Sequence, residues 1–188
     1  MIKTLIFDFG DVFINLDKQG AMDNALQLFN LKEFEADMIE TNKAYEIGKI
    51  TTDVFLSFYC SKFPKLSKSE ITEAWNFIIK DFPEYRLDFI QQLAREKKYN
   101  LILLSNTNEM HINFIKQNVS FYNEFKNCFD KFYLSHEIHL RKPNTDIYEF
   151  VLNENNLNAE ECLFIDDTKE NTEAAKTLNI NTWNIDET

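Results

Sequence analysis

Three short runs of apolar residues, each ending at a polar side chain, constrain the fold of this chain most strongly. Continuous apolar runs of this length are typical of strands that are buried on both faces of a parallel sheet. The runs are residues 4–7, 100–104 and 162–165, and the polar side chains that follow them are Asp8, Ser105, and the pair Asp166 and Asp167. Weaker strand patterns occur at residues 132–134 and 181–185. The chain is therefore predicted to contain a buried, mostly parallel sheet.

Helical patterns separate these strand candidates, at about residues 84–98, 108–118, 145–153 and 169–178. Strands that alternate with helices indicate an α/β fold, in which an open, mostly parallel sheet is the middle one of three layers. The predicted fold class is therefore α/β, with helices on both faces of the sheet.

The stretch between the first two strands, about 80 residues long, contains no comparable strand, and its apolar residues recur at helical spacing. Ser67 and Glu70 have the spacing of a capping box, which starts a helix. A right-handed crossover between parallel strands needs far fewer residues. We therefore expect a core domain of residues 1–14 and 84–188 and a small helical domain of residues 15–83 that lies over the sheet.

Composition limits the partners of the protein. The chain has 188 residues, with 31 acidic and 20 basic side chains and a formal net charge of −11, so nucleic acids and anionic membranes are not expected partners. It has only three glycines, too few for a dinucleotide-binding fingerprint or a phosphate-binding P-loop.

The N-terminal residues do not resemble a signal peptide, and we expect a cytoplasmic protein. The three histidines lack metal-ligand spacing and are expected at the surface or at helix caps.

The polar residues after the strands are expected to meet at one edge of the sheet, because ligands of open α/β sheets bind beyond the carboxyl ends of the strands. Three converging carboxylates, those of Asp8, Asp166 and Asp167, would repel one another unless a cation lay between them. A hard divalent ion, Mg²⁺, fits such ligands. Lys142 adds a fixed positive charge, and the Ser105 hydroxyl adds a donor for phosphoryl oxygens. This set of groups is suited to phosphoryl transfer.

At four places the sequence resembles the haloacid dehalogenase (HAD) superfamily, whose core is Rossmann-like. The matching segments are residues 7–12 (FDFGDV), 103–108 (LLSNTN), 140–143 (LRKP) and 164–171 (FIDDTKEN). They come in the family's order, and the helical insert after the first segment matches the family's cap domain. Within the superfamily, the chain is most similar to sugar-phosphate phosphatases and to the phosphatase-like domain of epoxide hydrolases.

The resemblance implies roles for individual residues. Asp8 matches the nucleophile that forms an aspartyl-phosphate, and Ser105 and Lys142 match the phosphate-binding residues, with Asn106 expected to help orient the phosphate. The metal ligands implied are Asp8, the backbone carbonyl of Gly10, Asp167, and Asp166 either directly or through water. Lys142, Arg141 and the ion are then the evident sources of positive charge in the pocket.

Gly10 departs from the family's usual pattern, in which a second Asp at this position serves as general acid and base. Positioned proton transfer contributes about 10²–10⁴-fold in rate, so its loss has consequences. Asp11, one residue further on, is a candidate replacement, although it also fits a turn residue. Alternatively, the leaving group departs without help, as an anomeric sugar hydroxyl, a phenol or an acyl group would.

The function predicted from the sequence is a Mg²⁺-dependent phosphatase of small phosphorylated metabolites, with a glycosyl 1-phosphate as the favoured substrate. Because of Gly10, a catalytically weak or inactive protein that binds phosphorylated ligands is one alternative. A metal-independent dehalogenase-type hydrolase is another, and the Asp166–Asp167 pair weighs against it. A signalling receiver domain combines similar residues, but there the acidic pair comes near the start and the chain is much shorter, whereas here the pair follows Lys142 and a helical insert intervenes. The sequence leaves the oligomeric state open.

Overall fold

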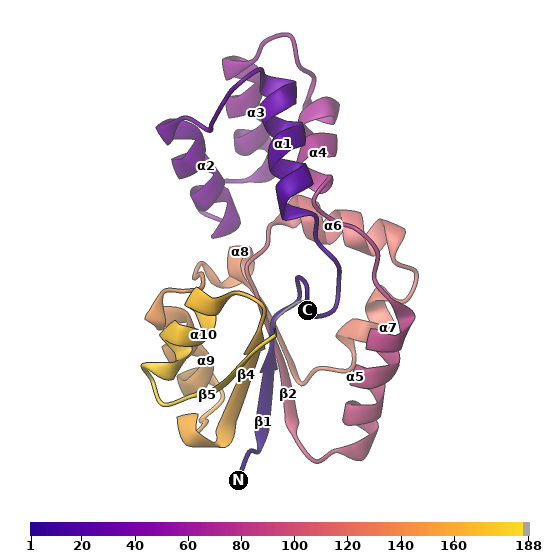
Figure 1. Ribbon diagram of the computed structural model, residues 1–188, viewed down its shortest axis with the longest axis vertical. Coiled ribbons are helices and arrows are strands. Elements are labelled where there is room, and N and C mark those ends of the chain that lie inside the picture. The colour runs from indigo at the N-terminus through magenta and orange to yellow at the C-terminus, as the bar shows by residue number, and fades with distance from the viewer. Residues whose placement is uncertain (186–188) are drawn as a thin grey trace.

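The computed structural model of the protein describes residues 1–185 and contains one five-stranded sheet. All strand pairs are parallel, in the order β3-β2-β1-β4-β5 (Figure 1). The strands are β1 (Thr4–Phe7), β2 (Asn100–Ser105), β3 (Lys131–Leu134), β4 (Cys162–Asp166) and β5 (Asn181–Asn184). The α/β fold class predicted from the sequence is confirmed, and each of the five strand candidates forms a strand.

Alternate residues of the central strands pack into separate hydrophobic cores on the two faces of the sheet, because successive side chains of a strand point to opposite faces. Leu5 and Phe7 of β1 belong to one core, whereas Ile6 belongs to the other. The first core is covered by α5 (Glu84–Glu96), α6 (Glu109–Asn118) and α7 (Tyr122–Lys126), and the second by α9 (Thr145–Glu154) and α10 (Lys169–Lys176). The sheet is therefore the middle of three layers.

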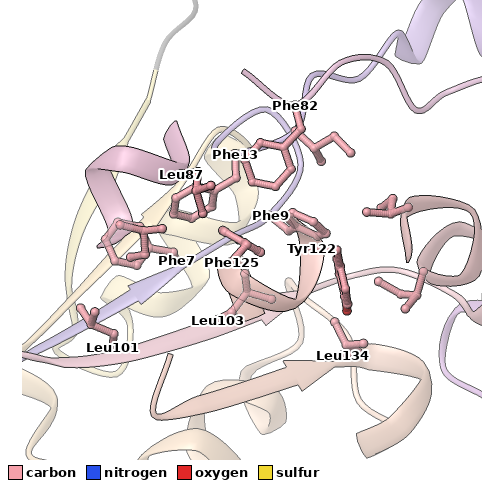
Figure 2. Packing of buried hydrophobic residues seen from close by; sticks show 14 of the residues in the cluster. Phe7, Phe9, Phe13, Phe82, Leu87, Leu101, Leu103, Tyr122, Phe125 and Leu134 are labelled. Carbon is pink, nitrogen blue, oxygen red and sulfur yellow. The ribbon is translucent and has the colours of Figure 1, made fainter. Parts of the chain in front are cut away.

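A cluster of phenylalanines fixes the loop that follows β1. Figure 2 shows Phe9 and Phe13 packed against Phe125 of α7, with ring centroids 5.2 and 4.9 Å from that of Phe125. Phe13 also lies 5.5 Å from Phe7 in an edge-to-face arrangement, a geometry that aromatic pairs favour. These contacts hold the backbone on both sides of Asp8 and so position its carboxylate.

Four helices form a separate bundle at one end of the molecule, beyond the carboxyl edge of the sheet (Figure 1). They are α1 (Lys18–Phe29), α2 (Ala36–Glu46), α3 (Thr52–Lys62) and α4 (Lys68–Asn76). The bundle has its own core of aromatic side chains, in which Phe55 contacts both Tyr59 and Trp75. The predicted capping box is present, since Ser67 and Glu70 each accept a backbone N–H of the other.

Two antiparallel segments connect this bundle to the sheet. Leu16 pairs with Ile79, and the backbone N–H groups of Asn15 and Asp17 donate to the carbonyls of Asp81 and Ile78, each at 2.9 Å. We call the bundle the cap; its division from the core at residues 15–83 stays a prediction. Two short elements complete the fold, the helix α8 (Ser135–Ile138) and the 3₁₀ helix η1 (Ala159–Glu161). Within residues 1–185, no helix has both the length and the apolar character required to cross a membrane.

Candidate active site

The sheet topology brings the acidic ends of two strands together. β1 and β4 are neighbours, and Phe7 pairs with Ile165, so Asp8 and Asp166 follow side by side at the carboxyl edge. The chain continues from β1 to β2 on one side of the sheet, whereas β4 lies on the other side, which makes this a topological switch point. Ligands of open α/β sheets bind at such points.

Lys142 lies between these two carboxylates and is buried, with 1% of its surface exposed. Its Nζ atom is 2.8 Å from Asp8 Oδ1 and 2.6 Å from Asp166 Oδ2. Burial lowers the pKa of the Lys142 ammonium, but the charges of Asp8 and Asp166 outweigh it and leave the pKa raised. Lys142 therefore carries a permanent positive charge between the two acids.

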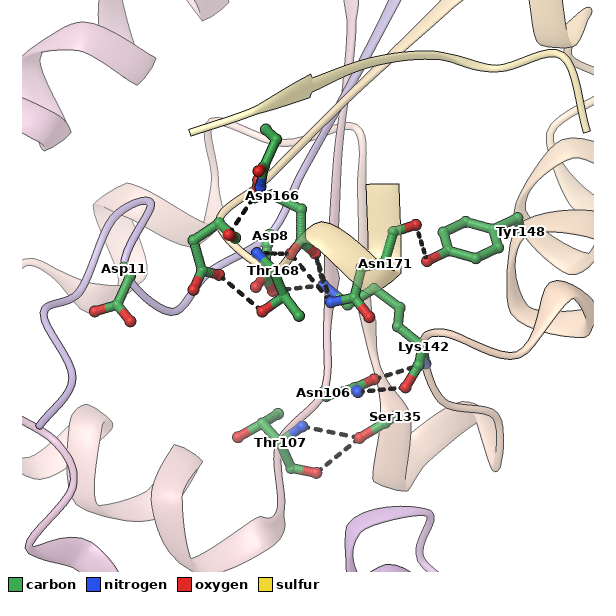
Figure 3. A network of polar contacts seen from close by, with 12 residues as sticks. Asp8, Asp11, Asn106, Thr107, Ser135, Lys142, Tyr148, Asp166, Thr168 and Asn171 are labelled. Atoms are coloured by element: carbon green, nitrogen blue, oxygen red, sulfur yellow. Dashed lines mark hydrogen bonds and ion pairs between the residues drawn. The ribbon is translucent and has the colours of Figure 1, made fainter. Parts of the chain in front are cut away.

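Asp8 and Asp166 lie in different environments although they share Lys142. Burial raises the pKa of the Asp8 carboxyl to about 7; Lys142 counteracts this rise and the charge of Asp166 adds to it. Asp166 is fully buried and accepts the backbone N–H of Thr168 at 2.8 Å and the side-chain amide of Asn171 at 3.0 and 3.1 Å (Figure 3). Asp166 is thus fixed in place by three donor groups, counting the ammonium of Lys142.

Asp167 completes an acidic cluster. Carboxylate oxygens of Asp8, Asp166 and Asp167 lie within 4.8 Å of one another, so the three predicted metal ligands with carboxylate side chains do come together. An all-oxygen set at this spacing suits a hard divalent cation. Gly10 lies in the loop next to this cluster, and a Cβ atom at its position would be 2.6 Å from Leu16 Cδ1. The side chain of Leu16 therefore fills the space beside Gly10.

The carboxylate of Asp11 is engaged in the loop and with the cap. Asp11 has a φ of 54°, a left-handed conformation that aspartate tolerates better than most residues. Its Oδ1 atom accepts the backbone N–H of Leu16 at 2.8 Å, and its Oδ2 atom lies 2.7 Å from the ammonium of Lys18. In Figure 3 Asp11 lies apart from the bonded network of Asp8 and Lys142. These contacts are those of a turn residue.

Ser105 and Asn106 lie at the end of β2, beside the acidic cluster. Ser105 is buried. The side-chain amide of Asn106 donates to the Lys142 carbonyl at 2.8 Å, and its oxygen accepts the Lys142 N–H at 2.9 Å (Figure 3). The Asn106 side chain thus positions the backbone of Lys142, a contact that neither residue's sequence context indicated.

Two other residues of this network, Lys18 and Asn171, were not among the predicted site residues. Lys18, the first residue of α1, joins the cap to the core, since its ammonium lies 2.6 Å from Asp167 Oδ2 as well as contacting Asp11. Asn171 holds Asp166, and its own carbonyl accepts the buried hydroxyl of Tyr148 at 2.8 Å. Asn171 lies within the fourth matching segment, and its place in that motif was a signal that could have identified it. Lys18 lies outside the four matching segments, and its position depends on the path of the loop before it, so the sequence held no signal for its contacts.

A cavity of about 160 Å³ lies at the carboxyl edge of the sheet and is lined by Gly10, Ser105 and Asn106 among others. The three acids, the buried lysine and this cavity define a hydrolase site of the phosphoryl-transfer type on a three-layer α/β fold with a helical cap. The family model described as "Haloacid dehalogenase-like hydrolase" matches residues 5–185. The chain belongs to this family of hydrolases.

Curated and structural relatives agree with this assignment. A protein named D-ribitol-5-phosphate phosphatase, from Bacteroides thetaiotaomicron, is 29% identical over 194 aligned positions, which cover 97% of this chain and 91% of the relative. A crystal structure of a HAD family enzyme from the same organism, a magnesium complex, has 34% identity and a TM-score of 0.87 and covers 98% of this chain and 93% of that one. The same enzyme in complex with magnesium and inorganic phosphate gives a TM-score of 0.85 at 34% identity, with 98% and 94% of the two chains covered.

Proposed function

We propose that this protein is a Mg²⁺-dependent phosphatase that hydrolyses monophosphates of small sugars or polyols through an aspartyl-phosphate at Asp8. The observation that carries this proposal is the position of Lys142, buried and within 2.8 Å of both Asp8 and Asp166, next to the third acid Asp167. The names of the relatives, a sugar-alcohol phosphatase and a magnesium-bound enzyme, support the substrate class and the metal.

Asp8, Asp167 and the backbone carbonyl of Gly10 would hold the magnesium ion, together with Asp166 either directly or through water. The donor set fits, because carboxylate oxygens of the three acids lie within 4.8 Å of one another, whereas the buried ammonium of Lys142 contacts two of them, Asp8 and Asp166. When bound, the ion neutralises phosphate charge and orients the phosphoryl group. The Asp166 carboxylate also accepts hydrogen bonds from the backbone N–H of Thr168 and the side-chain amide of Asn171, so its orientation is fixed.

In the proposed reaction, a carboxylate oxygen of Asp8 attacks phosphorus and the bond from phosphorus to the substrate oxygen breaks. The leaving alkoxide takes up a proton and departs as an alcohol. Water then attacks the phosphorus of the aspartyl-phosphate, which releases phosphate and restores the Asp8 carboxylate. Lys142 and the hydroxyl of Ser105 hold the phosphoryl oxygens while their charge develops.

Because residue 10 is glycine, the leaving group has no side-chain acid at the position where the family usually has one. Asp11 is bonded to Leu16 and Lys18, and we propose that it supports the loop rather than donating this proton. Solvent water then supplies the proton, and substrates with more acidic leaving groups react faster. A glycosyl 1-phosphate, whose leaving group is an anomeric hydroxyl, is therefore proposed as one good substrate beside the polyol phosphates.

The test is a hydrolysis assay with D-ribitol 5-phosphate, glucose 1-phosphate and phenyl phosphate, each with Mg²⁺ and with excess chelator. We expect phosphate release from these substrates with Mg²⁺ and almost none with chelator. Asp8→Asn should lower kcat by roughly 10⁴-fold or more, because a nucleophile is lost. Turnover by Asp8→Asn at the wild-type rate would exclude the covalent mechanism, and full activity in chelator would exclude the metal.

A further inference from the structure

A second cavity, of about 370 Å³, lies between the cap helices α1, α2 and α4 and the N-terminal end of the core helix α6. Four residues line both this cavity and the smaller cavity next to Gly10 and Ser105. They are Glu46, Ile78, Asn108 and His111. The two cavities therefore adjoin, and a substrate whose phosphate lies near Ser105 would extend past these four side chains into the cap.

Three of these four side chains have no free polar group for a substrate. Ile78 is apolar. Asn108 caps α6 by accepting the N–H of His111 at 3.0 Å, and its amide nitrogen lies 3.2 Å from His111 Nδ1. The other ring nitrogen of His111, Nε2, lies 3.0 Å from the backbone carbonyl of Trp75. Burial lowers the pKa of His111 to about 4, so its ring is neutral and both nitrogens are occupied.

Glu46 is the exception. Its Oε1 atom accepts the guanidinium Nε–H of Arg141 at 2.5 Å, whereas Oε2 has no hydrogen-bond partner among residues 1–185. The backbone of Glu46 is fixed as well, because its carbonyl accepts the Ser135 hydroxyl at 2.7 Å. Thr107, two residues after the end of β2, contacts the same Ser135 hydroxyl, which accepts its N–H at 2.9 Å and lies 2.8 Å from its carbonyl oxygen. Glu46 is thus a cap residue whose position is fixed relative to the carboxyl edge of the sheet.

We propose that Glu46 is the residue that recognises the hydroxyl groups of the substrate, through its Oε2 atom; this inference rests on the proposed phosphatase function. A carboxylate accepts hydrogen bonds from hydroxyl groups, and bonds to a charged acceptor are stronger than neutral ones. The same charge repels a second anionic group on the substrate. The site therefore favours polyhydroxylated monophosphates over phosphates without hydroxyl groups, and it disfavours bisphosphates.

The variant Glu46→Gln separates recognition from support of the cap. Glutamine has the same shape and keeps an oxygen for Arg141, but it turns the free acceptor into an amide NH₂ and removes the charge. Glu40→Gln is the matched control, because Glu40 is an exposed acid on the same helix. The substrates are D-ribitol 5-phosphate, which has a hydroxyl chain, and phenyl phosphate, which has none.

For Glu46→Gln we expect kcat/KM for ribitol 5-phosphate to fall about tenfold or more, while that for phenyl phosphate and competitive inhibition by inorganic phosphate stay within about twofold. Glu40→Gln should leave the ratio of the two kcat/KM values unchanged. An equal fall for both substrates in Glu46→Gln would mean that Glu46 only supports the cap, and it would overturn this inference. If the wild-type protein hydrolysed neither substrate with Mg²⁺, the proposed function itself would fail, and this inference with it.

Discussion

The ammonium of Lys18, the first residue of the cap helix α1, lies 2.6 Å from Asp167 Oδ2 and 2.7 Å from Asp11 Oδ2 in the core. Lys18 is thus a cation that a metal ion at Asp167 must compete with or displace. The two charges favour the same carboxylate and repel each other. Binding of the metal is therefore expected to depend on a cap residue that is not a metal ligand.

Lys18→Gln should tighten the binding of Mg²⁺, because it removes a competing positive charge from Asp167. The side chain of Lys18 is half exposed, and exposed ion pairs are worth up to about 1 kcal/mol, so we expect roughly a two- to fivefold lower dissociation constant. Isothermal titration calorimetry with MgCl₂ measures it. Lys62→Gln is the control, because Lys62 bridges two acids within the cap. Weaker binding in Lys18→Gln would contradict this interpretation.

Asp11→Asn should leave catalysis nearly intact. Asparagine tolerates the left-handed backbone at this position and keeps an acceptor for the N–H of Leu16, but it cannot act as an acid. If Asp11 only supports the loop, kcat for phenyl phosphate and for ribitol 5-phosphate should change by less than about threefold. A loss of 10²-fold or more, about the contribution of a general acid, confined to the substrate with the poorer leaving group would instead identify Asp11 as the proton donor.

Lys142→Met should destabilise the metal-free protein strongly. It leaves Asp8 and Asp166 buried without their shared cation, and breaking a buried ion pair from one side costs about 3–5 kcal/mol. The free energy of unfolding, measured by urea denaturation in EDTA at pH 8, should fall by that amount. Lys169→Met removes an exposed lysine on α10 and should change it by no more than about 0.5 kcal/mol. Equal effects of the two variants would show that the buried pairs contribute nothing.

The stability of the metal-free protein should depend on the protonation of Asp8. Burial raises its pKa from 3.8 to about 7 in the folded protein, so between these values the folded state binds a proton that the unfolded state does not. The free energy of unfolding in EDTA should therefore increase as the pH falls from 8 towards 4, by at most about 1.4 kcal/mol per pH unit from this group. Asp8→Asn carries no such proton, and the wild-type increase should exceed that of the variant. Parallel profiles would contradict the raised pKa.

The sequence by itself determined the sheet and the acidic cluster. Residues 5–7 and 162–165 are apolar at every position, a pattern that is typical of a strand buried on both faces. Asp8 and Asp166 come at the carboxyl ends of such runs, so their meeting follows from the parallel pairing of the strands. The capping box at Ser67 was likewise readable, because its two partners are three residues apart.

Only the tertiary structure decided how the remaining polar groups are paired. Lys18 contacts Asp167, 149 residues further along the chain, and Glu46 contacts Arg141, 95 residues away. No periodic pattern encodes such contacts, because they depend on where the cap sits over the sheet. For the same reason, the engagement of Asn106 with the backbone of Lys142 had no sequence signal. Local patterns fix which residues form strands, whereas long-range packing fixes which charges share a site.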